Sequence, residues 1–192
     1  MSCTWRRAAL ALSVLLFTTA TVGCGVAEQV TQRVVGPEWQ EATSASGNYV
    51  AEFPGRPNTR TQTVPGSELA LQLTEVEFGG DAYTLSETEL HGITPYPLDA
   101  AVDNSLESAR AGQESSSGNQ VTANELSRST GDFEGVETRR FRGELVDGDK
   151  RATMSSLVFY RDDAIVQAIV VSNGPVDAES VDRFLSSLKP AN

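Results

Sequence analysis

The stretch Ala164-Ile-Val-Gln-Ala-Ile-Val-Val171 decides the fold. Gln167 is its one polar residue, and most other positions hold isoleucine or valine, whose branched side chains favour strands. A strand that is apolar on both faces must be covered on both faces. The stretch is therefore predicted to be the middle strand of a sheet.

The chain before this strand is predicted to run back and forth in hairpins. Val136–Val146 and Arg151–Tyr160 have the pattern of strands, and Asp147-Gly148-Asp149 and Arg161-Asp162-Asp163 supply turns. The second strand has apolar side chains on both faces, with Met154, Val158 and Tyr160 on one and Leu157 and Phe159 on the other. This pattern predicts neighbouring antiparallel strands in the covered part of the sheet.

Strands are also predicted in the N-terminal half. Trp39–Thr43 and Tyr49–Phe53 are short strands separated by a polar turn, and Leu69–Leu90 is a hairpin that turns at Gly79-Gly80-Asp81. The apolar alternation changes phase within this hairpin, which predicts a bulge near Thr74-Glu75.

Two helices are predicted from apolar residues at helical spacing. The first covers Leu98 to about Ala111. The second follows Asp177, which suits an N-cap, and ends before Pro190. Its apolar stripe consists of Val181, Phe184, Leu185 and Leu188.

The segments between the helices complete the predicted fold. Val121–Leu126 is expected to be a strand, whereas the polar segments Glu114–Asn119 and Ser129–Gly135 are expected to be loops. Consecutive hairpins followed or interrupted by amphipathic helices predict an α+β fold, in which an antiparallel β-sheet is flanked by helices.

Three segments resemble the PsbP-like fold: Tyr49-Val-Ala-Glu-Phe-Pro-Gly-Arg-Pro57, the strand pair Met154–Val171, and the helix end Phe184-Leu-Ser-Ser-Leu188. The resemblance covers roughly Trp39 to Lys189. PsbP is a lumenal photosystem II subunit, and similar domains occur in exported bacterial lipoproteins, including the mycobacterial LpqN-type group. The resemblance implies an α/β/α sandwich with a binding or assembly role, and it carries over no catalytic residue.

The N-terminus has the order of a secretory signal peptide. The basic pair Arg6-Arg7 precedes the apolar run Ala8–Ala20, which is shorter than the roughly 20 apolar residues of a spanning helix. Val22-Gly23-Cys24 then resembles the lipobox of bacterial lipoproteins. The resemblance implies cleavage between Gly23 and Cys24 and attachment of diacylglycerol to the Cys24 thiol.

The predicted organisation is a lipoprotein signal peptide at 1–23, a tether at 24–37 and a single domain at 38–192. Cys3 and Cys24 are the two cysteines, and cleavage would remove Cys3, so no disulfide could form within the mature chain. Thr21 stands where a lipobox usually has an aliphatic residue. Cleavage by an ordinary signal peptidase, with Cys24 left as a free thiol, is therefore the alternative.

The charge of the chain limits its partners. It has 15 Lys and Arg residues against 26 Asp and Glu residues, for a formal net charge of −11. Such a body is repelled by nucleic acid and by anionic lipid head groups. The body should therefore stand off the membrane surface, while the lipid implied on Cys24 holds the protein at the cell membrane, on the extracytoplasmic side. The expected partners are an envelope protein or a small apolar ligand, and no nucleic acid.

The sequence contains no recognisable catalytic or metal-binding set. His91 is the single histidine, and without a Gly-x-Ser-x-Gly motif it is expected to be an exposed loop residue. One histidine and one lipid-modified cysteine cannot complete a zinc site. The turn Asp147-Gly148-Asp149 is followed by Lys150 and Arg151, which would repel calcium. We predict no cofactor, no metal site and no catalytic residue.

Arg139, Arg140 and Arg142 form a basic cluster on a predicted strand. Alternation places Arg139 on the same face as Phe141, and Arg140 and Arg142 on the opposite face. We expect all three to be neutralised by the many acids. A small anion-binding patch is the alternative, although the negative charge of the chain opposes anion capture at long range.

These observations leave three functions open. The first is a non-enzymatic binding or assembly module of the cell envelope, and the second is a carrier of a small apolar ligand or lipid. The third and least supported is a hydrolase that uses a serine and His91.

Overall fold

The computed structural model describes residues 37–63, 69–92 and 96–191. The predicted signal peptide, the Gly23–Cys24 cleavage and lipidation site, and the tether before residue 37 lie outside the described residues.

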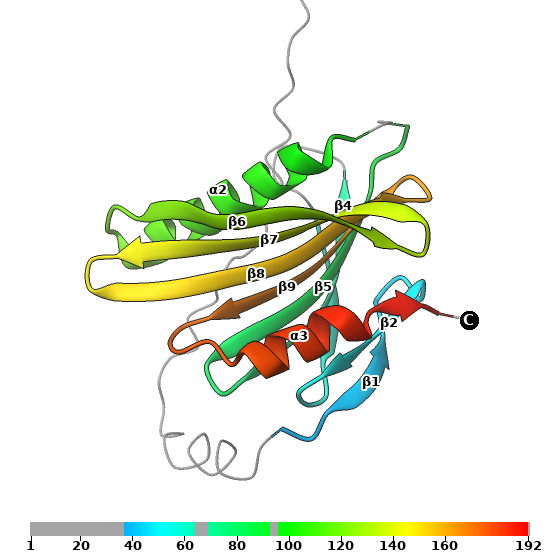
Figure 1. Cartoon of the computed structure of the whole chain (residues 1–192), viewed down its shortest axis with the longest axis horizontal. Helices are drawn as coiled ribbons and strands as arrows, with labels where there is room; N and C mark the ends of the chain where they lie inside the picture. The colour runs from blue at the N-terminus through cyan, green and yellow to red at the C-terminus, as the bar shows by residue number, and fades with distance from the viewer. Residues whose placement is uncertain (1–36, 64–68, 93–95, 192) are drawn as a thin grey trace, which may run out of the picture.

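The described residues fold into two antiparallel sheets and two helices (Figure 1). The elements are β1 (Gln40–Thr43), β2 (Tyr49–Phe53), β3 (Asn58–Thr63), β4 (Ala70–Phe78), β5 (Asp81–Glu89), α2 (Leu98–Ser117), β6 (Thr122–Phe133), β7 (Val136–Asp147), β8 (Lys150–Arg161), β9 (Ala164–Ser172), α3 (Ala178–Ser187) and β10 (Lys189–Pro190). The main sheet has seven strands in the order β3-β4-β5-β9-β8-β7-β6. The small sheet has the order β1-β2-β10.

Strand β9 occupies the middle of the main sheet, as predicted, between β5 and β8. Its side chains alternate between two separate hydrophobic cores. Ile165 and Ile169 belong to the core beneath α2, whereas Val166 and Val170 belong to the core beneath α3. We call the two sides of the main sheet the α2 face and the α3 face.

Helix α2 lies along the α2 face, behind the sheet in Figure 1. Ala101, Val102 and Ala109 turn inward and are almost fully buried. Small residues let the helix lie close to the strands. A buried polar pair joins the two layers, because the Gln167 side chain donates to Ser105 Oγ at 2.8 Å.

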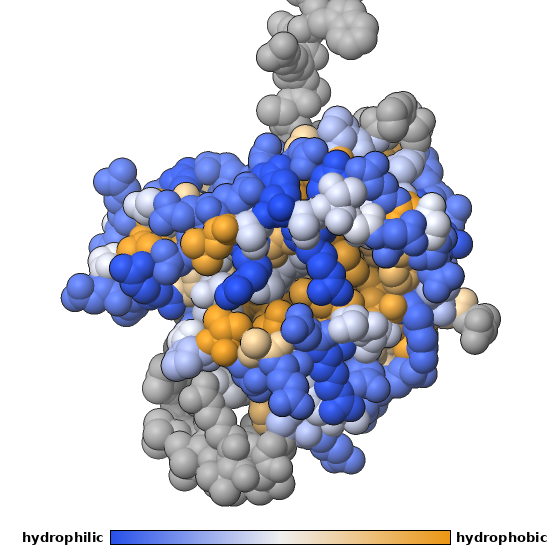
Figure 2. All heavy atoms as spheres, viewed as in Figure 1, coloured by the Kyte–Doolittle hydropathy of each residue, from blue (hydrophilic) through white to orange (hydrophobic). Residues whose placement is uncertain are grey.

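The α3 face is covered by a composite layer made of α3 and the small sheet (Figure 1). Phe184 of α3 is at its centre, with its ring 5.1 Å from that of Phe53 and 5.5 Å from that of Tyr83. The expected N-cap is present, since Asp177 accepts hydrogen bonds from the backbone N–H groups of Glu179 and Ser180. Figure 2 views this face and shows apolar surface left open between α3 and the strands above it.

The architecture confirms the predicted α+β fold with an antiparallel sheet flanked by helices. Several boundaries differ. Helix α2 continues into the predicted loop at Glu114–Asn119 and ends at Ser117, and the next residue, Gly118, takes a left-handed φ of 71°. The last turns are polar because they face solvent, and the Arg110–Glu114 ion pair at 2.6 Å supports them.

The predicted loop at Ser129–Gly135 was also wrong, because β6 continues to Phe133. This strand forms one edge of the sheet, so none of its residues is buried and no alternation marks it. Strand β3 (Asn58–Thr63), which we did not predict, forms the other edge and is likewise exposed. Edge strands with polar side chains resist recognition by hydrophobic pattern.

The expected bulge at Thr74-Glu75 is absent, since β4 pairs with β3 and β5 in unbroken register. The apolar pattern changes phase there because the first half of β4 contributes side chains to one hydrophobic core and the second half contributes to the other. Leu71 and Leu73 point into the α2-side core, and Val76 packs against the α3-side core. The register shift of the main sheet lies instead in β6, between Glu125 and Ser127.

Candidate functional site

The residues considered for chemistry from the sequence do not form a shared site. His91 is exposed in the turn after β5, as expected of a loop histidine, with a positive φ of 49°. Asp147 is buried at the end of β7, where it accepts a hydrogen bond from the Asn119 side chain at 2.8 Å. Within residues 37–63, 69–92 and 96–191, no group of three or more His, Cys, Asp or Glu side chains could hold a metal ion.

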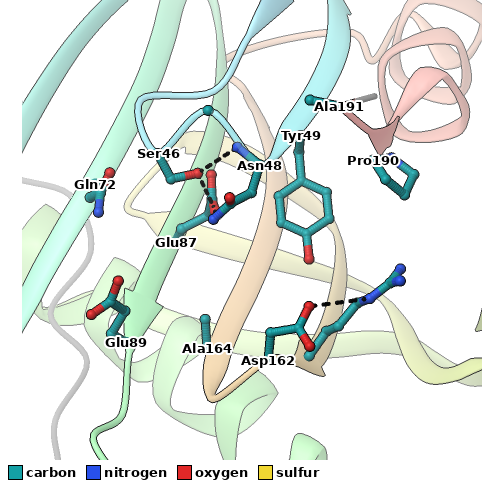
Figure 3. Close-up of a pocket in the computed structure, with 12 residues that line it drawn as sticks. Ser46, Asn48, Tyr49, Gln72, Glu87, Glu89, Asp162, Ala164, Pro190 and Ala191 are labelled. Atoms are coloured by element: carbon teal, nitrogen blue, oxygen red, sulfur yellow. Dashed lines mark hydrogen bonds and ion pairs between the residues drawn. The ribbon is translucent and has the colours of Figure 1, made fainter.

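A polar pocket of about 300 Å³ opens at one end of the α3 face (Figure 3). The turn between β1 and β2 forms one wall, β5 forms the floor, and the β8–β9 turn and the C-terminal segment close the other side. Its polar lining is formed by Ser46, Asn48, Tyr49, Gln72, Glu87, Glu89, Arg161 and Asp162. We call it the Glu87 pocket.

Glu87 is the buried acid of this pocket, with 5% of its surface exposed. Its carboxylate accepts hydrogen bonds from Ser46 Oγ at 2.5 Å and from Asn48 Nδ2 at 3.3 Å. The Ser46 hydroxyl in turn accepts from the Asn48 backbone N–H at 3.0 Å. The β1–β2 turn is thereby fastened to the main sheet through a buried charge, whose remaining acceptor capacity is available to the pocket.

Tyr49 extends beside Glu87 in Figure 3. Burial is the main cause that raises the pKa of its phenol to about 12, and the nearby Glu87 carboxylate raises it further. The phenol is therefore neutral at physiological pH. It can donate a hydrogen bond to a ligand, but it cannot act as a base.

The β8–β9 turn positions the opposite wall. Asp162 and Asp163 both have positive φ, at 52° and 63°, as a tight two-residue hairpin turn requires. The Asp163 carboxylate stabilises this conformation by accepting from the Gly92 N–H and the Tyr160 hydroxyl, each at 2.9 Å. Fixing the turn fixes its neighbour Arg161 at the pocket.

Arg161 is incompletely satisfied. Its Nε lies 3.5 Å from the Asp162 carboxylate, whereas its Nη1 is buried and has no hydrogen-bond partner among the described residues. A buried donor without a partner is costly, and a ligand acceptor would relieve that cost. The pocket thus combines one cation with three acids, Glu87, Glu89 and Asp162, so its net charge favours a ligand that carries a positive group.

The sequence pattern predicted no pocket here, although it contains one signal for it. Glu87 has the same parity on β5 as Tyr83 and Leu85, which face the α3-side core. An acid at an apolar position of a strand marks either a buried partner or a site. Arg161 and Ser46 gave no such signal, because turn residues carry no face pattern.

Comparison with known proteins identifies the fold alone. No family model and no curated protein matches the sequence. The solution structure of cyanobacterial PsbP (CyanoP) from Synechocystis sp. PCC 6803 matches with a TM-score of 0.53 and 13% identity, over 88% of this chain and 98% of that one. A protein of unknown function from Pseudomonas aeruginosa, PA94, matches with a TM-score of 0.34 and 8% identity, over 74% and 85% of the two chains.

The structural match to cyanobacterial PsbP supports the predicted PsbP-like fold. In the part of the chain that the structure describes, neither helix is both long and apolar enough to cross a membrane.

Proposed function

We propose that this chain is a cell-envelope lipoprotein of the LpqN type, anchored through lipid on Cys24, whose body is a non-enzymatic binding or assembly module. The signal-like N-terminus and Val22-Gly23-Cys24 motivate the anchor. The body uses the Glu87 pocket to hold its partner.

The observation that carries the binding role is the combination of a buried carboxylate and an unpartnered buried guanidinium nitrogen around one pocket. Glu87, Glu89 and Asp162 attract a basic group, and Arg161 Nη1 offers a donor to an acceptor on the same ligand. A basic side chain and its adjacent backbone carbonyl supply both features. We therefore propose a Lys or Arg side chain of a partner protein as the occupant.

The size and the charge of the molecule agree with this occupant. The volume of about 300 Å³ is at the lower end of the roughly 300–1,000 Å³ typical of small-molecule sites, which suits one side chain. The net charge of −11 steers basic surfaces toward the protein. A carrier of an apolar ligand is less well supported, because charged groups surround the pocket.

The anchor is tested by metabolic labelling with a palmitate analogue. We expect the full-length protein to be labelled and the Cys24→Ala variant to be unlabelled. Equal labelling of both proteins would rule out lipidation at Cys24.

The pocket is tested with lysine amide and arginine amide as stand-ins for a basic side chain, followed by NMR chemical shifts of the full-length protein. We expect saturable shifts at Asn48 and Tyr49, weakened in Glu89→Gln. Glu77→Gln is the matched control, because it removes an exposed acid from the neighbouring strand outside the pocket. Equal weakening by both variants, or no saturable shift, would contradict the proposal.

A further inference from the structure

Strand β7 divides its arginine cluster between the two faces of the main sheet. Arg139 is on the α2 face, where its Nε lies 3.0 Å from Asp99 of α2 and its Nη1 pairs with Glu137. Arg140 and Arg142 alternate onto the α3 face. Neither makes an ion pair with another described residue, although acids outnumber bases in this chain. The sequence-based expectation of neutralisation is therefore correct for Arg139 and wrong for the other two.

The two unpaired arginines line a second pocket, of about 200 Å³, between α3 and the strands β6, β7 and β8. We call it the Arg140 pocket. Three serines face the arginines across the strands, because Ser129 is opposite Arg140, and Ser127 and Ser155 are opposite Arg142. Residues directly opposite in an antiparallel pair share a face, so these hydroxyls and guanidinium groups are on the same side.

The bulge in β6 creates this arrangement. Before the bulge, Glu125 is opposite Gly143, and after it Ser127 is opposite Arg142. Strand β6 therefore has one residue more than β7 over this interval. Without the bulge, Ser127 would be opposite Phe141 and would face α2. A bulge reverses which residues face each side of a strand. Here it turns two serines toward the unpaired arginines and turns Arg128 toward the acids of α2.

Helix α3 forms the opposite wall of the Arg140 pocket. Val181 and Leu185 of the helix, with Val176 just before it, make this wall mainly apolar, and Asp182 is the one acid among the described lining residues. Figure 2 shows apolar surface bordered by strongly hydrophilic side chains in the hollow between α3 and the strands. Two guanidinium groups thus face a single carboxylate, which leaves a positive site on an acidic protein.

We propose that the Arg140 pocket binds a phosphate group. Each guanidinium offers five N–H donors in a planar fork, and three hydroxyls add to them. A carboxylate has about four lone-pair positions on two oxygens, whereas a phosphate has more oxygens and accepts from several directions. The small volume suits a single phosphate group and the apolar wall suits a short substituent on it. This site is separate from the Glu87 pocket and does not depend on the function proposed for that pocket.

The test is an NMR titration of the full-length protein with inorganic phosphate at constant ionic strength, with acetate as the competing anion class. We expect saturable binding of phosphate, with shifts at Ser127, Ser129 and the two arginine side chains, and much weaker binding of acetate. The Arg140→Gln/Arg142→Gln double variant should lose more than about tenfold in affinity, because it removes the charged hydrogen bonds of both guanidinium groups.

Arg139→Gln is the matched control, since it removes the same charge from the same strand on the opposite face. It should bind phosphate as the natural protein does. Arg140→Lys keeps the charge without the planar fork, so its affinity for phosphate should fall between that of Arg139→Gln and that of the double variant. Failure of phosphate to saturate, equal affinity for acetate, or an equal loss in Arg139→Gln would overturn the proposal. Thermal melting of each variant confirms that it is folded before its affinity is compared.

Discussion

The two faces of the main sheet are covered in different ways. One continuous helix, α2 (Leu98–Ser117), covers the α2 face, whereas α3 and a three-stranded sheet share the α3 face. A single helix seals a strip of sheet along its whole length. A composite cover leaves spaces beside each of its parts: the Glu87 pocket lies next to the small sheet, and the Arg140 pocket lies next to α3. A hollow of about 460 Å³ on the other face is confined to the C-terminal end of α2.

Polar groups follow the same division. On the α2 face the buried Gln167 is satisfied by Ser105 of the helix, and Arg128 and Arg139 are paired with acids. On the α3 face, no described residue forms an ion pair with Arg140 or Arg142, and none gives Arg161 Nη1 a hydrogen-bond partner. Neighbouring arginines of one strand thus have different roles because of what covers each face. Ser156 is an exception on the α2 face, because its buried Oγ, opposite Phe141 and Ile169, has no hydrogen-bond partner among the described residues.

The largest expected effect comes from breaking the composite cover at its centre. Phe184 is fully buried against Phe53 and Tyr83, so Phe184→Ala should lower the free energy of unfolding by about 3–5 kcal/mol. Leu126→Ala is the control, because Leu126 is 53% exposed and should contribute little. Urea denaturation measures both. Similar losses in the two variants would mean that the aromatic cluster does not hold the cover.

The second test breaks the close packing of α2. A Cβ atom at Gly143 would lie 2.9 Å from Leu106 Cδ1 and 2.8 Å from Phe141 Cζ. Gly143→Ala should therefore cost about 1–3 kcal/mol through overpacking. At Gly174 a Cβ atom meets nothing within 4 Å, so Gly174→Ala is a matched control that should be nearly neutral. An unchanged unfolding midpoint in Gly143→Ala would contradict close packing on this face.

The tyrosines of the α3 face should give that layer a response to alkaline pH. Burial raises the pKa of Tyr49 and of Tyr83 from about 10 to about 12. The native state therefore keeps protons that the unfolded state loses, and the resulting stability is present below pH 10 and disappears as pH rises from 10 to 12. Denaturation at several pH values should show a shallower decline in Tyr49→Phe/Tyr83→Phe. A decline of unchanged slope would contradict this account.

The smallest expected effect concerns the ion pairs of the α2 face. Arg139, and next Arg128, lowers the pKa of Asp99 by hydrogen bonding to its carboxylate. The stabilisation is thus present at neutral pH and is lost as pH falls through the lowered value. Arg139→Gln should reduce the melting temperature slightly at low salt and not at high salt, whereas Arg140→Gln should leave it unchanged. Equal changes of melting temperature in the two variants would contradict the claim that Arg139 is paired on the α2 face and Arg140 is unpaired on the α3 face.

Much of the fold could be predicted because the interior is strongly patterned. The apolar run of β9, the two-sided pattern of β8 and the stripe of α3 each report directly on burial. The edge strands β3 and β6 were harder to predict, because backbone pairing rather than side-chain burial maintains them.

The pockets depend on register and turn geometry, which a single sequence shows poorly. The bulge beyond Glu125 determines where Ser127 points, yet no residue there marks it. The unpaired state of Arg140 and Arg142 depends on which acids α2 and α3 place nearby. Two features of the sequence pointed to a site in advance: the parity of Glu87 on its strand, and the arginine cluster of β7, for which an anion-binding patch was the alternative.

The central claim is that partners bind the α3 face and that the α2 face is structural. Photo-crosslinking in cells tests it directly, with a photoreactive residue placed either at Gln72, which lines the Glu87 pocket, or at the exposed Glu107 of α2. We predict a discrete crosslinked partner from position 72, abolished by Glu89→Gln, and only background from position 107. A partner captured at position 107 but not at position 72 would contradict the account.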